Sequence, residues 1–192
     1  MSARPRPLIV ALALAAAGSL ALGATPAAFA APAVPAVPAA KPVTDFPHPD
    51  LKKTYDATVK YKSEQKAIDD GYQRTDECVE DPKLGGMGYH YVNPANLGST
   101  DPTKPAAVLY EENHKTGKRE LVAVEWVVPD PDENLPRPRL FDRDFDGPFD
   151  FEPVGPHYSL HAWIFKKNPK GVFTPYNPRV HCTPCPEDHP KA

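Results

Sequence analysis

Between residues 50 and 72, apolar and aromatic side chains recur every three or four positions, the spacing of one face of an α-helix. The positions on this stripe are Leu51, Tyr55, Thr58, Tyr61, Gln65, Ile68 and Tyr72. Asp50 is a suitable N-cap, and Gly71 is a suitable left-handed residue to end the helix. Because the stripe is aromatic and only half apolar, it predicts a helix that covers a sheet.

After Cys78 the pattern changes to an alternation with period two, which predicts β-strands. The four segments with this pattern are residues 89–92, 106–111, 119–128 and 157–167. The connection 112–118 contains Gly117 and is typical of a hairpin. We therefore predict an α+β fold: one N-terminal helix packed on a curled antiparallel sheet or partial barrel of about four or more strands.

The first 30 residues have the pattern of a signal peptide. Arg4 and Arg6 precede an apolar run at 8–22, which is followed by the small-x-small sequence that ends at Ala30. The run is shorter than the stretch of about 20 residues that spans a bilayer. We therefore expect cleavage near Ala30 and a secreted, extracellular protein with no membrane span after cleavage.

Proline, with 26 copies in 192 residues, marks further divisions of the chain. Residues 31–49 are rich in proline and alanine and predict a disordered linker. Residues 50–182 then form a single globular domain, and 183–192 a disordered tail. Within the domain, the long proline-rich and acidic loop 129–156 has two interpretations, a lid or a disordered insertion.

Charge and motif content exclude several classes of protein. The net charge is −3, whereas nucleic-acid binding requires a basic surplus that displaces counterions from phosphates. No Gly-x-Ser-x-Gly, P-loop or dinucleotide-binding glycine motif is present. Gly85, Gly86 and Gly88 indicate a tight turn that lets His90 approach another strand, because no helix follows to bind a phosphate.

Glu125 is the polar exception in a segment, 121–128, that is apolar on both faces of a strand. We expect this carboxylate to be at least partly buried whichever face points inward. Removing a carboxylate from water costs several kcal/mol unless it is paired, coordinated or protonated. Glu125 should therefore have a partner.

Two histidines on neighbouring strands are candidate partners. His90 and His161 each lie among aromatic residues and, with Glu125, form the donor set of a two-histidine, one-carboxylate site for zinc, copper or iron. His157 lies four residues before His161, about 13 Å along a strand, so we place it at the mouth of the site or as a fourth member. The aromatic residues expected to form its walls are Tyr89, Tyr91 and Trp163.

The same residues have a structural interpretation, in which a His–Glu pair holds strands in register without a ligand. If the pocket does bind a ligand, this could be a small polar molecule in place of a metal ion. The sequence does not specify catalytic residues. An open coordination position would suit metal-assisted hydrolysis or oxidation. A protein of another class, a noncatalytic secreted interaction module or inhibitor, would use its proline-rich loops for contacts and its histidines for structure.

Asp142, Asp144 and Asp146 match the opening of a calcium-binding loop, D-x-D-x-D-G. The twelfth position is Pro153 where the loop requires Glu, and Pro148 follows Gly147 directly. This favours an acidic turn over a calcium site.

Three cysteines in an exported chain indicate one disulfide and one remaining thiol. We expect the pair Cys78–Cys182, in which Cys78 lies just after the predicted helix and Cys182 beyond the last predicted strand. Cys182 and Cys185 form a C-x-x-C, but no helix follows to lower a thiol pKa. A zinc knuckle with His189 is disfavoured in a secreted protein.

Three segments resemble those of a group of small exported actinobacterial proteins without assigned activity. They are 76–79 (DECV), 85–94 (GGMGYHYVNP) and 157–163 (HYSLHAW). The resemblance covers about residues 57–182 and implies an exported single domain with a retained histidine set. It implies no substrate, cofactor or mechanism, and the tail at Cys185 departs from its pattern.

Overall fold

The computed structural model describes residues 46–151 and 154–182, all within the compact unit 41–192. The predicted signal peptide, the predicted linker up to residue 45 and the predicted tail lie outside the described residues. In the described part of the chain, no helix has the length and apolar character needed to cross a membrane.

The predicted helix is present but interrupted. Helix α1 (Pro49–Thr58) continues as the 3-10 helix η1 (Val59–Lys62), so that 14 residues are helical without a break. Ser63 is extended, and α2 (Glu64–Asp69) follows it. The N-cap is His48, whose Nδ1 accepts a hydrogen bond from the Asp50 amide, so the expectation that Asp50 caps the helix is wrong. Gly71, with a φ of +95°, follows the end of α2 as predicted.

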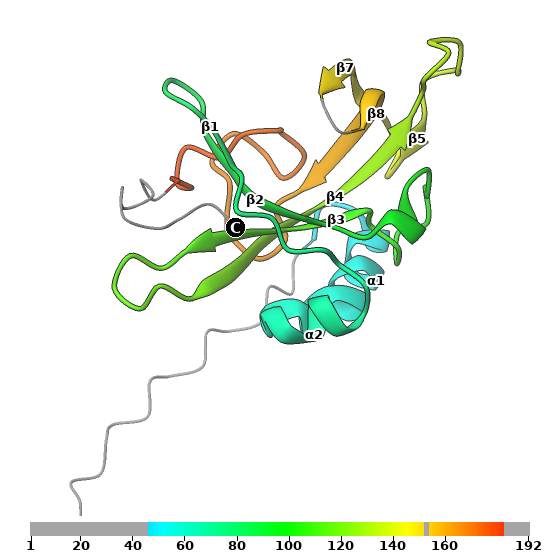
Figure 1. Ribbon diagram of the computed structural model, residues 1–192. Coiled ribbons are helices and arrows are strands. Elements are labelled where there is room, and N and C mark those ends of the chain that lie inside the picture. Colours follow the sequence, from blue (N-terminus) through cyan, green and yellow to red (C-terminus); the bar gives the residue numbers. More distant parts are fainter. Residues whose placement is uncertain (1–45, 152–153, 183–192) are drawn as a thin grey trace, which may run out of the picture. The chain divides into compact units, whose positions relative to one another are not determined.

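The helices pack against a curled, antiparallel, six-stranded half-barrel sheet, which confirms the predicted α+β fold. Its strands, in spatial order, are β1 (Cys78–Asp81), β2 (Gly85–Val92), β3 (Ala107–Glu112), β4 (Arg119–Pro129), β8 (Gly155–Ala162) and β7 (Asp146–Phe151). The helices lie on one side of this sheet, and the chain that follows β8 runs along the other (Figure 1).

The helix side of the sheet holds the larger core. Aromatic and aliphatic side chains from alternate strand positions pack there against α1, η1 and α2. Those of the strands include Tyr89, Tyr91, Val108, Tyr110, Val124, Trp126, Leu160 and Ala162. The residues between them in sequence therefore point to the opposite face of the sheet.

The covering segment, 163–182, contributes Trp163 and Val180 to a smaller apolar cluster on the opposite side. Ile164 and Phe173 of the same segment belong to the helix-side core. The backbone of this segment approaches β2 very closely: a Cβ built on Gly86 would lie 2.8 Å from the carbonyl oxygen of Val180. The glycines at the start of β2 therefore do not form the expected turn. They lie within the strand and let the covering segment touch its backbone.

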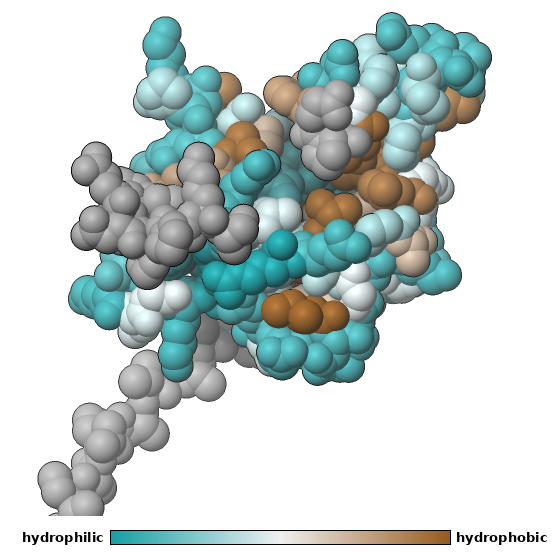
Figure 2. Space-filling model, viewed as in Figure 1, coloured by the Kyte–Doolittle hydropathy of each residue, from teal (hydrophilic) through white to brown (hydrophobic). Residues whose placement is uncertain are grey.

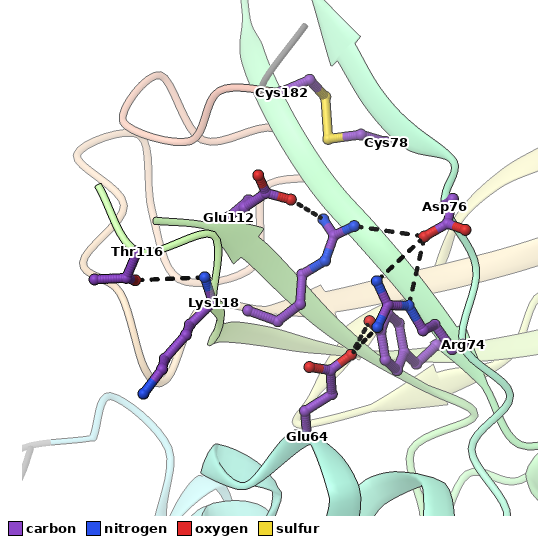
Figure 3. Close-up of polar contacts among 10 residues, drawn as sticks. Glu64, Arg74, Asp76, Cys78, Glu112, Thr116, Lys118 and Cys182 are labelled. Atoms are coloured by element: carbon purple, nitrogen blue, oxygen red, sulfur yellow. Dashed lines mark hydrogen bonds and ion pairs between the residues drawn. A yellow bond between two sulfur atoms is a disulfide. The ribbon is translucent and has the colours of Figure 1, made fainter. Parts of the chain in front are cut away.

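The predicted disulfide, Cys78–Cys182, is confirmed, with a Cα–Cα distance of 5.7 Å. It joins the beginning of β1 to the end of the covering segment (Figure 3). A hydrogen bond links the same two segments, because the Cys182 N–H donates to Oε2 of Glu80 at 2.8 Å.

The predicted loop 129–156 contains more regular structure than expected. Strands β5 (Arg139–Leu140) and β6 (Arg143–Asp144) pair with each other, and β7 joins the edge of the main sheet beside β8. The sequence of β7 hides this pairing, because Gly147 and Pro148 interrupt its alternation and the register shifts between Asp146 and Phe149. Residues 152 and 153 lie outside the described residues.

Candidate metal centre

Strand register brings together the three residues of the predicted trio. Glu125 on β4 and His161 on β8 are directly opposite each other in the antiparallel pair. His90 comes from β2, two strands away on the other side of β4. At this point β3 places Ala107 opposite Glu125, and its methyl group leaves room for His90 and Glu125 to meet above the strand.

Glu125 lies between the two imidazoles. Its Oε2 is 3.5 Å from Nε2 of His90, and its Oε1 is 3.5 Å from Nε2 of His161. The two rings are perpendicular, with centroids 6.2 Å apart. One ligand atom from each residue lies within 4.8 Å of the others.

All three side chains are shielded from solvent. The exposed fraction is 1% for the side chain of His161, 7% for Glu125 and 19% for His90. Burial lowers the pKa of His90, partly opposed by the charge of Glu125. Burial also lowers the pKa of His161 to about 4, partly opposed by the charge of Asp146. Both imidazoles are therefore neutral near pH 7, the form that donates a lone pair to a metal ion.

The hydrogen bonding of His161 is incomplete. Neither Nδ1 nor Nε2 has a hydrogen-bond partner, although both atoms are buried. Trp163 stacks beside the ring at 6.5 Å between centroids, but its indole N–H donates to the backbone oxygen of Thr174. Most buried polar groups in proteins do have a partner, so an imidazole with two unpartnered nitrogens needs a physical explanation.

The distances suit a small ion with only local adjustment. Two ligand atoms bound at about 2.1 Å to a tetrahedral ion are about 3.4 Å apart. Each imidazole nitrogen lies 3.5 Å from a different oxygen of Glu125, so whichever oxygen binds the ion already has this separation from one of the two nitrogens. The remaining pairs of ligand atoms, which are at most 4.8 Å apart, would approach each other by up to about 1.4 Å, a movement within the reach of side-chain rotation.

The other predicted site residues do not all meet at this point. Trp163 lies beside His161 as expected, but Tyr89 and Tyr91 are not walls of the site. They alternate with His90 along β2, so they point into the helix-side core. There Tyr91 donates from its hydroxyl to Glu64 at 2.6 Å, and the Tyr89 ring packs under the guanidinium of Arg119.

His157 shares the face of His161 but does not belong to the cluster of ligand atoms. Its Nδ1 lies 2.7 Å from the backbone oxygen of Gly155, and its ring packs against Phe149 and Phe151. It lies further along β8 beside the edge strand β7, so it is not the fourth member of the cluster that the sequence left open.

The three acids of the incomplete calcium motif are separated in space. Asp142 is exposed and contacts His48, Asp144 pairs with Arg139, and Asp146 lies in β7. Among the described residues, the only cluster with the geometry of a metal site is the trio.

Sequence reasoning missed the place of Asp146 beside His161. Its only sequence signal was membership of the acidic run, which indicated a turn. Asp146 reaches the site because of the register in which β7 pairs with β8, and β7 has no periodic sequence pattern from which it could be predicted.

Comparison of the chain with protein-family models, curated proteins and solved structures found no match.

Proposed function

We propose that this protein is an exported metal-binding protein that holds a divalent transition metal ion between His90, Glu125 and His161. The single observation that carries the proposal is the state of His161, a fully buried imidazole with both nitrogens unpartnered beside a buried carboxylate. A bound ion would satisfy Nε2 of His161 and would neutralise the charge of Glu125.

Stability alone is a weak explanation for this cluster. Each buried polar atom without a partner costs about 1–3 kcal/mol, and apolar residues in the same positions would avoid that penalty. A bound ligand would offset this penalty, because its binding free energy adds to the stability of the folded state.

The donor set favours zinc, copper or iron over magnesium and calcium. Imidazole nitrogen suits transition metals, whereas Mg²⁺ and Ca²⁺ prefer oxygen ligands. Two histidines and one carboxylate are also the protein ligands of many zinc enzymes, in which a water molecule takes the fourth position. If the site is catalytic, an open position of this kind would support metal-assisted hydrolysis or oxidation.

Export is part of the same proposal. The disulfide supports it, because such bonds persist in oxidising compartments and are rare in the cytosol. The positively charged, then apolar, start of the chain supports it independently.

The test is metal analysis of protein purified without an affinity tag or chelator, followed by zinc titration of the chelator-treated protein. We expect about one ion per chain in the wild type. His90→Ala, His161→Ala and Glu125→Gln should each weaken zinc binding by more than the roughly 10–100-fold typical of residues that only support ligands.

His157→Gln is the matched control, because His157 lies on the same strand and face as His161 but outside the cluster. It should bind zinc like the wild type. Equal, substoichiometric metal in the wild type and in all three site variants would reject the proposal.

An exposed aromatic patch favours a second candidate, a noncatalytic interaction module. Phe151 is 63% exposed at the end of the edge strand β7 and lies beside Phe149. Apolar side chains gather around this end of the molecule (Figure 2). A wild type that binds no metal, together with a Phe151→Ser variant that loses binding to cell-wall material or a secreted protein, would favour this candidate.

A further inference from the structure

We propose that Asp146 is a positioning residue for His161: its carboxylate accepts the Nδ1–H of the imidazole and so leaves the Nε2 lone pair for the metal ion. The inference rests on the proposed metal site but concerns a hydrogen bond that we expect to form with or without the ion. It gives the edge strand β7 a role in the site.

Strand order places Asp146 on the correct side of the imidazole. β8 lies between β4 and β7, so His161 has Glu125 on one side and the β7 chain on the other. Asp146 is directly opposite Ser159, and Ser159 is two residues before His161 on the same face. Asp146 and His161 are therefore diagonal neighbours, with Cα atoms about 7–8 Å apart, a span that their two side chains can close.

The two ring nitrogens match the two carboxylates. Nε2 of His161 faces Glu125 at 3.5 Å, and Nδ1, separated from Nε2 by one ring carbon, points in a different direction. Nδ1 of His161 and Oδ2 of Asp146 are both buried, and neither has a hydrogen-bond partner. The charge of Asp146 also acts on His161, since it partly offsets the effect of burial on the histidine pKa. Side-chain rotation into direct contact, or one buried water between the two atoms, would satisfy both.

The backbone around Asp146 is held in place by a separate set of contacts. Arg137 donates to the backbone oxygens of Phe145 and Gly147, the residues on either side of Asp146. Gly147 has a φ of +115°, and a Cβ there would lie 3.0 Å from the backbone oxygen of His157. These contacts fix the direction of the Asp146 side chain, as a residue that orients another requires.

The chemistry of this arrangement is that of a supporting carboxylate. A histidine that binds a metal through one nitrogen usually donates the proton on the other to a carboxylate or a carbonyl oxygen. The partner fixes the tautomer and the ring orientation and makes the imidazole a stronger donor. With Asp146 on Nδ1, His161 carries its proton there before any ion arrives.

The test has two readouts, of which the first requires no metal. The tautomer of His161 in chelator-treated protein is measured from the 15N chemical shifts of its ring. We expect the Nδ1–H form in the wild type and the Nε2–H form in Asp146→Ala. Asp144→Ala is the matched control, because Asp144 is an exposed acid two residues earlier that pairs with Arg139; it should leave the tautomer unchanged.

The second readout is zinc affinity. Asp146→Ala should bind zinc about 10–100-fold more weakly than the wild type and the Asp144→Ala control. Asp146→Asn keeps the shape and an acceptor oxygen but loses the charge, so its affinity should be intermediate. If the alanine variant does not fold, a zinc affinity of Asp146→Asn equal to that of the wild type would overturn the inference.

The outcomes separate this inference from the proposed function. An Nε2–H tautomer in the wild type, or an unchanged tautomer in Asp146→Ala, overturns the role of Asp146 even if zinc binds. A wild type that shows the Nδ1–H tautomer but binds no metal rejects the proposed function, while the hydrogen bond from His161 to Asp146 stands.

Discussion

The two faces of the sheet bury polar groups in different ways. On the helix side, the hydroxyl of Tyr110 donates to the backbone oxygen of Tyr61, and that of Tyr72 donates to the backbone oxygen of Pro105. On the opposite side, His161 has two unpartnered nitrogens and Asp146 one unpartnered oxygen. The buried tyrosine hydroxyls of the first face therefore have partners in the folded chain, whereas the histidine and aspartate of the second have unused hydrogen-bonding capacity.

The edge of the helix side shows the same tendency towards pairing. A series of alternating charges links α2 to the sheet (Figure 3): Glu64, Arg74, Asp76, Arg119 and Glu112. Arg119 has two nitrogens without a hydrogen bond, but its guanidinium lies between two carboxylates and over the Tyr89 ring. The contrast suggests that the helix side maintains the fold and that the other side is available to a ligand.

The largest effect should come from the helix-side core. Trp126→Ala removes a fully buried ring that packs against Phe141 and a hydrogen bond from its indole N–H to the backbone oxygen of Asp101. Loss of a buried aromatic side chain costs about 3–5 kcal/mol. Chemical denaturation should show this decrease, and Phe151→Ala, at an exposed position, should change stability by less than about 0.5 kcal/mol. Equal effects of the two variants would contradict the assignment of the core.

On the opposite face, removal of a buried polar side chain should have a much smaller effect. His161→Leu exchanges a buried imidazole with incomplete hydrogen bonding for an apolar group of similar size, and it also loses the proposed hydrogen bond to Asp146, worth about 0.5–1.5 kcal/mol, so the stability of the metal-free variant should lie within about 1 kcal/mol of the wild type. Denaturation in the presence of a chelator measures this difference. A destabilisation above about 1 kcal/mol would mean that both ring nitrogens of His161 have strong partners in the metal-free protein. The contrast between the two faces would then be wrong.

The same pair of proteins should differ in their response to acid. The folded-state pKa of His161 is lowered to about 4, below the usual value of 6.5, so the unfolded chain binds more protons between these values. His161 therefore decreases stability as the pH falls from about 6.5 towards 4. Thermal denaturation of the metal-free wild type should show this decrease, and His161→Leu should show less of it. Parallel pH profiles would indicate that His161 is not neutral in the folded protein.

A smaller effect is expected where a polar group on the helix side loses its partner. Tyr110→Phe keeps the ring but leaves the backbone oxygen of Tyr61 without its 2.7 Å donor. The loss of a typical intramolecular hydrogen bond costs about 0.5–1.5 kcal/mol. Denaturant midpoints of the two proteins give the value. A Tyr110→Phe variant as stable as the wild type would contradict the view that polar groups on the helix side depend on their partners.

The sequence was sufficient to predict the elements that have a strong period. The alternation in 119–128 identified β4 and placed Glu125 between apolar neighbours, and the aromatic stripe of 50–72 identified a helix that covers a sheet. Parity along a strand also separates His90 from Tyr89 and Tyr91. Applied to β2, it would have excluded the two tyrosines as walls of the site.

The missed features depend on pairings that no local pattern encodes. β7 is a short edge strand with a register shift, and its sequence resembles a calcium loop more than a strand. The role of the glycines at 85 and 86 depends on the backbone of residues 177–180, which arrives from almost a hundred residues further along the chain. Contacts between segments so far apart in sequence cannot be predicted from a local pattern, and only the three-dimensional structure shows them.

The bond between Cys78 and Cys182 encloses almost the whole sheet in one covalent ring. A protease that cuts the exposed turn between β3 and β4 would open the polypeptide without releasing either piece. Two fragments would appear on a denaturing gel only after reduction, and the nicked molecule would keep its parts together.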